Sequence, residues 1–161
     1  MLSLIVFLPL VGVLLVLAIP GENRAALRLT TLTVMVIDWL LTIYLLSTFD
    51  TASSGFQYVI DIPWLTSLGI DYHLGVDGLS AILIFLTALL SWISVLSSWH
   101  AVQVRVKEYM ISFLLLELGM LGVFCALDFL LFYVFWEIVL VPMYIIIGVW
   151  GGPRKIYATI K

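Results

Sequence analysis

The stretch that decides the fold is residues 129–150, FLLFYVFWEIVLVPMYIIIGVW, in which one glutamate, Glu137, interrupts an otherwise uncharged and largely apolar run. A helix that crosses the hydrocarbon core of a bilayer needs about 20 mainly apolar residues, so this run suits a membrane span. Comparable runs occupy about residues 2–19, 27–46, 79–99 and 109–127, and residues 156–161 have the composition of the start of another. The sequence therefore predicts an all-α integral membrane protein with five complete spans and the beginning of a sixth.

The composition supports the same fold class. Of the 161 residues, 64% are hydrophobic and 11% are charged, whereas about a quarter of an ordinary soluble domain is charged. The net charge of −3 is small and spread along the chain, so the sequence offers no basic surface for nucleic acid. The single cysteine, Cys125, lies in an apolar run, and we expect a buried packing residue rather than a metal or disulfide site.

The basic residues predict the orientation of the spans. The seven Lys and Arg residues fall in alternate connections, after the first, third and fifth runs: Arg24, Arg28, Arg105, Lys107, Arg154, Lys155 and Lys161. No Lys or Arg is expected inside a span. Because basic loops stay on the cytoplasmic side, the N-terminus should be extracytoplasmic. The expected location is a bacterial inner membrane or an organellar membrane, which the chain crosses several times.

The long second connection has a pattern of its own. Apolar side chains alternate over residues 56–64 and 70–76, on either side of Thr66–Gly69. A period of two around a glycine-containing turn predicts a β-hairpin with one apolar face, and Asp71 and His73 should face water. Because an isolated hairpin is marginally stable, its apolar face should rest on a neighbour or on the membrane surface.

Three acidic residues lie inside the predicted spans: Asp38, Glu117 and Glu137. A charge near the centre of a span costs about 2.5–3.5 kcal/mol, so all three should face protein or water. With no basic residue inside a span, each acid is either protonated or paired with a cation outside this chain. An acid whose cationic neighbour can move is a proton-binding switch, which indicates pump or antiporter chemistry.

Glu137 is the main candidate for proton translocation, followed by Glu117. Tyr133 and Tyr144 place hydroxyl groups on the Glu137 face of the helix, and Pro142 leaves the carbonyl near Ile138 without its usual partner. The alternative is that each acid only joins helices through hydrogen bonds, an interpretation that applies above all to Asp38.

Small and polar residues indicate how the spans pack. One face of the third span carries hydroxyl groups, which favour close packing or line a hydrated path: Ser80, Thr87, Ser91, Ser94 and Ser98. A seam of small residues lies almost opposite Glu117 on the fourth span: Gly119, Gly122 and Ala126. Asp77 is placed to cap the N-terminus of the third span.

Three segments resemble a known family: residues 75–90 (GVDGLSAILIFLTALL), residues 108–152 (EYMISFLLLELGMLGVFCALDFLLFYVFWEIVLVPMYIIIGVWGG) and residues 153–161 (PRKIYATIK). They are similar to the subunit M (chain 4) family of proton-translocating NADH:quinone oxidoreductase, respiratory complex I. The resemblance is close over about two thirds of the chain, while the first two spans match in hydropathy alone.

The resemblance implies the N-terminal part of an antiporter-like subunit of about 14 spans, in which two inverted five-helix repeats form proton half-channels. Residues 1–107 would be an N-terminal membrane region, and residues 108–161 the truncated start of the proton-translocating module. Glu137 takes the position of the family's essential glutamate on the fifth helix, which pairs with a lysine on a later helix. Glu117 matches an acid on the fourth helix, and Asp38 receives no role.

The expected function is that of a membrane proton-channel subunit, which couples electron transfer from NADH to quinone with proton translocation. No nucleotide, redox, metal or catalytic-triad motif is present in the sequence. NADH, FMN, iron–sulfur clusters and quinone are therefore implied only for the whole complex, and the expected partners are its other membrane and peripheral subunits and the lipid bilayer. The alternatives are a subunit of a multisubunit sodium/proton antiporter, a related hydrogenase subunit, and a segment that by itself transports nothing.

Overall fold

The computed structural model describes residues 1–53, 55–65, 70–152 and 155. These residues form five helices and two strands, in the order α1 (Leu2–Ala18), α2 (Arg24–Ser47), β1 (Gln57–Leu65), β2 (Ile70–Val76), α3 (Gly78–Ser97), α4 (Val106–Cys125) and α5 (Phe129–Trp150). The five predicted spans are confirmed as helices to within about three residues at each end. The predicted turn Thr66–Gly69 and the predicted start of a sixth span at 156–161 lie outside the described residues.

The helices have the dimensions of membrane spans. Four of them, α2 to α5, are long and apolar enough to cross a bilayer, and α1 is a shorter apolar helix of 17 residues. At 1.5 Å per residue, α1 is about 25 Å long, slightly less than the hydrocarbon thickness of a typical bilayer. The described part of the chain is thus a mainly helical membrane protein.

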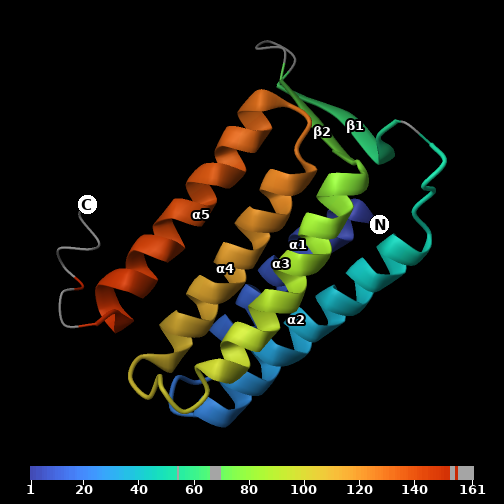
Figure 1. Cartoon of the computed structure of the whole chain (residues 1–161). Helices are drawn as coiled ribbons and strands as arrows, with labels where there is room; N and C mark the ends of the chain where they lie inside the picture. The colour runs from blue at the N-terminus through green and yellow to red at the C-terminus, as the bar shows by residue number, and fades with distance from the viewer. Residues whose placement is uncertain (54, 66–69, 153–154, 156–161) are drawn as a thin grey trace.

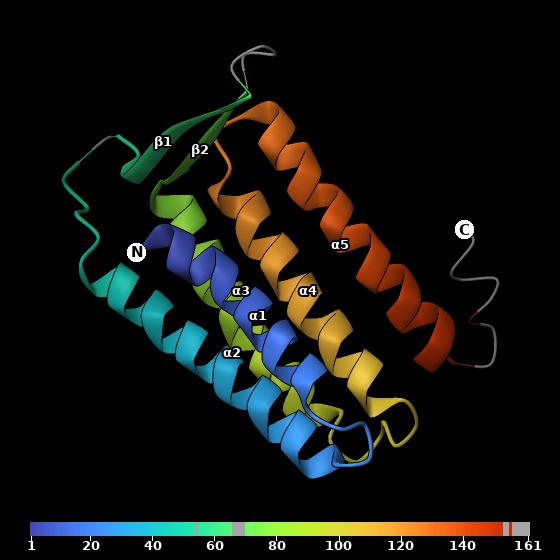
Figure 2. The same cartoon turned by 180° about the vertical axis from the view of Figure 1, so that it is seen from behind.

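Helix α4 lies at the centre of the bundle, and α5 lies at its edge (Figures 1 and 2). Helix α4 packs against α1, α2, α3 and α5, whereas the main helical neighbour of α5 is α4. In the most apolar part of each helix, 56% of the α4 residues but only 17% of the α5 residues are buried. One long side of α5 is therefore open in this chain.

Glycines set the closeness of two helix contacts. A Cβ on Gly12 of α1 would lie 2.9 Å from Val34 of α2, and a Cβ on Gly119 of α4 would lie 2.6 Å from Val139 of α5. A Cβ on Gly122 would overlap the ring of Phe135, which is buried on α5. The predicted small-residue seam of α4 is thus the surface on which α5 packs.

The predicted β-hairpin is present and covers one end of the bundle (Figure 1). Strands β1 and β2 are antiparallel, with Ile62 opposite Tyr72 and Asp61 opposite His73. The backbone carbonyl of His73 accepts a hydrogen bond from the N–H of Leu127, at 2.9 Å, which ties β2 to the α4–α5 connection. The Tyr72 hydroxyl also lies 3.1 Å from the Ser3 hydroxyl at the start of α1.

The alternating pattern predicts only half of the hairpin's packing. On β2, Leu74 and Val76 are fully buried, as expected, but Ile62 and Trp64 of β1 remain about half exposed. The register shifts between Gln57 and Ile60, where Tyr58 has a left-handed backbone with φ of 54°. Ile62 keeps the face of its partner Tyr72, and both Ile62 and Trp64 line an open groove beside Phe7 of α1 and Phe135 of α5, which leaves them exposed. Asp71 and His73, which were expected to face water, are half-buried.

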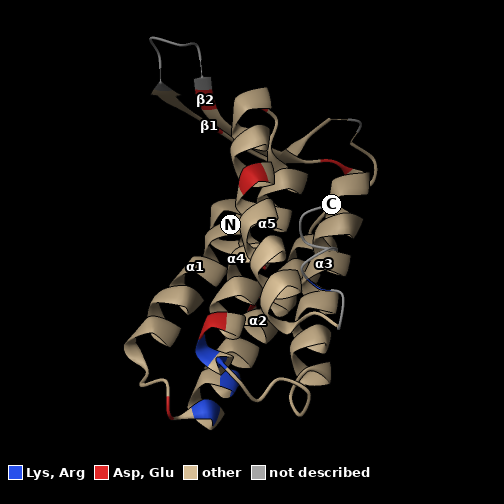
Figure 3. Cartoon of the chain, turned by 90° about the vertical axis from the view of Figure 1, so that its left-hand side faces the viewer, with Lys and Arg blue, Asp and Glu red and all other residues tan. Residues whose placement is uncertain are grey.

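The charged residues divide between the two ends of the bundle, as Figure 3 shows for the Lys and Arg residues at its lower end. Among the described cations, Lys107 holds the end of α1 through the carbonyls of Leu17 (2.9 Å) and Ile19 (2.8 Å). At the end covered by the hairpin, the charged residues among those described are acidic: Asp50, Asp61, Asp71, Asp77 and Asp128. The charge asymmetry read from the sequence is therefore also an asymmetry of the fold.

Arg28 corrects one expectation. It lies inside α2 rather than in a loop, and only 8% of its surface is exposed. Its guanidinium donates to the carbonyl of Val102 at 2.7 Å and to the side-chain oxygen of Gln103 at 3.3 Å, and it stacks over Trp99 at 5.6 Å. These groups of the α3–α4 connection stabilise the charged guanidinium, so a buried arginine is tolerated within a predicted span.

Candidate functional site

The three acids of the predicted spans lie on three different helices and do not form one site. Asp38 of α2 and Glu117 of α4 are completely buried, with 0% of each residue exposed. Glu137 of α5 is exposed instead, because α5 lies at the edge of the bundle. The structure therefore separates the main candidate from the other two.

Glu137 lies beside a groove between α1, α4 and α5. The groove has a volume of about 600 Å³, and apolar side chains form most of its lining, including Phe7 of α1 and Leu115 of α4. The hydroxyl of Tyr133 is close enough to the Glu137 carboxylate to interact with it. Pro142 lies inside α5, which continues past it, and proline cannot donate a backbone hydrogen bond to the residue 138 carbonyl. Polar groups thus follow the predicted stripe around Glu137.

Tyr144 lies about two helical turns beyond Glu137. It is 58% exposed and does not line the groove beside Glu137, whereas Tyr133, which is 51% exposed, does. Both hydroxyls thus lie on the exposed side of α5, and Tyr133 is the one close to the carboxylate.

A cationic partner for the three acids is absent from the described residues. The ion pair found among those residues joins Arg105 to Glu108 at 3.2 Å, and both side chains are about half exposed at the end of the bundle. Arg28 is held by the α3–α4 connection, as described above.

Asp38 and Glu117 both lie in the bundle interior, an arrangement that the sequence analysis missed. They are close enough to interact electrostatically, and none of their four carboxyl oxygens has a hydrogen-bond partner in the described residues. The indole nitrogens of Trp39 and Trp92, whose rings lie 5.6 Å apart between α2 and α3, are also unpartnered. A signal was present in the sequence, because polar residues recur on one face of α2, at Arg28, Thr31, Asp38 and Thr42.

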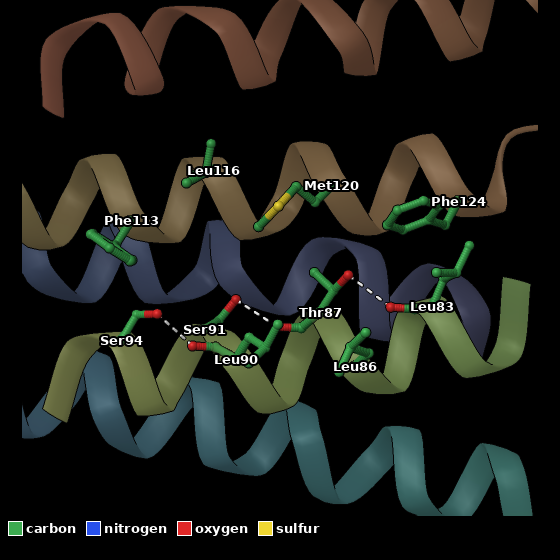
Figure 4. A pocket seen from close by; sticks show the side chains of 10 residues that line it. All are labelled: Leu83, Leu86, Thr87, Leu90, Ser91, Ser94, Phe113, Leu116, Met120 and Phe124. Carbon is green, nitrogen blue, oxygen red and sulfur yellow. Dashed lines mark hydrogen bonds between the residues drawn. The ribbon is translucent and has the colours of Figure 1, made fainter. Parts of the chain in front are cut away.

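The hydroxyl face of α3 borders a second groove, of about 350 Å³, between α3 and α4 (Figure 4). The hydroxyls of Thr87, Ser91 and Ser94 line it, and each donates to the carbonyl four residues earlier, at 2.7 to 2.9 Å. Each hydroxyl therefore keeps lone pairs that can accept a hydrogen bond. Leu116 and Met120 of α4 form part of the opposite wall.

Comparison with known proteins decides the family. The chain is 45% identical over 166 residues to NADH-quinone oxidoreductase subunit M of Rhodobacter capsulatus, and 42% identical over 159 residues to NADH-ubiquinone oxidoreductase chain 4 of Arabidopsis thaliana. These matches cover 100% and 98% of this chain, and 32% of each relative. The chain belongs to the subunit M (chain 4) family. It spans about a third of the length of the curated relatives it matches.

The fold supports the same family. A chain in the structure described as respiratory complex I from Thermus thermophilus with bound NADH matches 99% of this chain with a TM-score of 0.81 and 32% identity, and 31% of that chain is covered. A chain of an archaeal membrane-bound sulfane sulfur reductase has the same fold, with a TM-score of 0.69 and 18% identity. Residues 126–161, which include Glu137, match the family described as NADH:quinone oxidoreductase/Mrp antiporter, TM. The subunit M similarity thus extends over α1 and α2, where the sequence analysis found likeness in hydropathy only.

Proposed function

We propose that this chain is the N-terminal part of a proton-translocating membrane subunit of an NADH:quinone oxidoreductase, in which Glu137 binds and releases protons. The observation that carries the proposal is the match to subunit M over the whole chain, combined with an intramembrane carboxylate on the open side of α5. The open side is the surface where later helices of a subunit of about 14 spans would pack, and where a lysine could approach Glu137.

The chemistry of this chain is limited to the proton. Glu137 would hold a proton while no cation is near and release it when a lysine of a later helix approaches, because an adjacent positive charge favours the ionised carboxylate. Tyr133 can stabilise the carboxylate through its hydroxyl group. The carbonyl left open by Pro142 is a further acceptor for water or a protonated group.

Electron transfer would take place in other subunits. The one cysteine of this chain, Cys125, is fully buried in the apolar core. NADH, FMN and iron–sulfur clusters would be held by the peripheral subunits of the complex, and quinone would bind outside the described residues. Partners of this chain would be those subunits and the other membrane subunits.

The test is Glu137→Gln in the complete subunit within its membrane. Because glutamine keeps the size of the side chain but cannot ionise, we expect NADH-driven proton pumping to fall by at least tenfold, with NADH oxidation falling as well or remaining. Glu108→Gln is the matched control, because it makes the same chemical change at an exposed position on α4, at the end of the bundle. Normal pumping in Glu137→Gln membranes would exclude the proposed role.

A sodium/proton antiporter subunit is the second candidate, since the family that matches residues 126–161 is described with both activities. The same variant separates the two functions. An antiporter subunit would lose sodium tolerance in Glu137→Gln cells while NADH oxidation and NADH-driven pumping stay unchanged. The oxidoreductase subunit would lose pumping.

A further inference from the structure

The inner face of α2 combines apolar residues with several polar ones. Four polar residues of this helix are less than a tenth exposed: Arg28, Thr31, Asp38 and Thr42. The outer face of the same helix carries exposed apolar side chains: Leu29, Ile37, Leu40 and Ile43. A span surrounded by lipid keeps apolar groups outside, and ionisable groups on its inner side mark a function within the bundle.

The ionisable group that acts electrostatically on Glu117 of α4 is Asp38 of α2. Both residues are completely buried, and their four carboxyl oxygens have no hydrogen-bond partner in the described residues. Glu117 also lies near the Ser91 hydroxyl of α3. That hydroxyl donates its own hydrogen to the carbonyl of Thr87, at 2.9 Å, so it can accept a hydrogen bond from a protonated carboxyl.

Charges from neighbouring elements do not neutralise the two acids. Helices α1 and α3, which pack against α2, carry no ionisable side chain along their length. Besides Glu117, helix α4 contributes the buried thiol of Cys125, which also interacts electrostatically with Asp38. Arg28 is ten residues from Asp38, about 15 Å along the helix axis, and is bonded to the α3–α4 connection.

Two ionised carboxylates in this buried region would repel each other, and no cation among the described residues is bonded to them, so the stable arrangement keeps at least one proton on the pair. The protonation of one acid then depends on that of the other, as in other electrostatically coupled carboxyl pairs. The pair also has a route to the surface through Ser91. This residue lines the α3–α4 groove (Figure 4) and lies near Glu117.

We propose that Asp38 and Glu117 form a second proton-binding site between α2 and α4, in which the two buried acids titrate as a coupled pair and exchange protons through Ser91 and the α3–α4 groove. Proton binding at this site is independent of the proposed function, and only the part of the site in proton transport rests on that function. The site lies across α4 from the α5 surface that carries Glu137, because the glycine face of α4 packs on α5 while Glu117 faces α2. The chain would thus carry two separate proton sites on the two sides of its central helix.

The test is infrared spectroscopy of protonated carboxyl groups in the complete subunit, assembled in its complex at neutral pH. We expect Asp38→Asn and Glu117→Gln each to shift the carbonyl stretch of the remaining acid, and the double variant to lose that band. Glu108→Gln and Asp50→Asn are matched controls, because both carboxyls are exposed and outside the bundle interior. Ser91→Ala is expected to shift the band and to slow its exchange in deuterated water.

Two results would overturn the proposal. The first is a double variant whose protonated-carboxyl band equals that of the wild-type protein. The second is a double-variant difference spectrum equal to the sum of the two single differences, since independent acids would give that result. If the double variant does not assemble, Asp38→Asn decides alone, and an unchanged Glu117 band overturns the pair. Pumping by Glu137→Gln is measured separately, so a failure of the proposed function is distinguishable from a failure of this site.

Discussion

Asp77 shows how a single side chain sets the start of a span. Its carboxylate accepts a hydrogen bond from the backbone N–H of Ser80 at 2.7 Å, and this bond lowers the pKa of Asp77 below its usual value of 3.8. Because the pKa of Asp77 is lower in the folded state, its ionised carboxylate stabilises the fold at pH values above the ordinary pKa. This contribution is lost as the pH falls through the lowered pKa. We expect the hydrogen-exchange protection of the Ser80 amide to decrease in acid for the wild-type protein.

Asp77→Asn supplies the comparison for that prediction. Asparagine has an acceptor oxygen that caps a helix but no charge to titrate, so Ser80 protection should not depend on acidity in this variant. Equal acid profiles for the two proteins would show that the cap does not titrate. The cap itself was predictable from sequence, because Asp77 directly precedes an apolar run.

The acids inside the spans show where residue-level prediction stops. The sequence identifies Asp38, Glu117 and Glu137 as residues that are unfavourable within a membrane. The free energy of placing a charge there depends on residue type and on depth, and both can be read from the sequence. Their exposure depends on which helix is central, and hydropathy does not order the helices. Consequently, the sequence could not show that Glu137 is exposed on an edge helix, or that Asp38 and Glu117 are both completely buried.

At the scale of elements, the α4–α5 contact depends on Gly122. Because a Cβ at this position would overlap the buried ring of Phe135, we expect Gly122→Ala to destabilise the complete subunit by about 1–3 kcal/mol, the usual cost of overpacking. The measurement is thermal unfolding in detergent. Gly78→Ala is the matched control, since a Cβ on Gly78 meets no atom within 4 Å. An unchanged midpoint for Gly122→Ala would show that α5 does not pack tightly on this seam.

A helix or strand could be predicted from the sequence where a single hydrophobic pattern determines it. Long apolar runs identify the helices, and the alternating pattern identifies β1 and β2. The register shift near Tyr58 left no such signal, because tyrosine is not a residue type that commonly adopts a left-handed backbone, here with φ of 54°. Ile62 and Trp64 are about half exposed for another reason, since they line an open groove beside α1 and α5 that no pattern within β1 could show.

At the scale of the whole molecule, the distribution of charge predicts the orientation in the membrane. Described Lys and Arg residues lie where α1 ends, where α2 and α4 begin and beyond the end of α5, while the hairpin end carries aspartates. Basic ends remain in the cytoplasm, so the hairpin should be extracytoplasmic. We expect a thiol reagent that cannot cross membranes to label Thr51→Cys in right-side-out vesicles, and Ala101→Cys only after permeabilisation. Native Cys125 should stay unlabelled in both cases, because it is fully buried. Labelling of Ala101→Cys alone in sealed vesicles would show that the orientation is opposite to the predicted one. The side from which protons enter at Glu137 would then also be opposite.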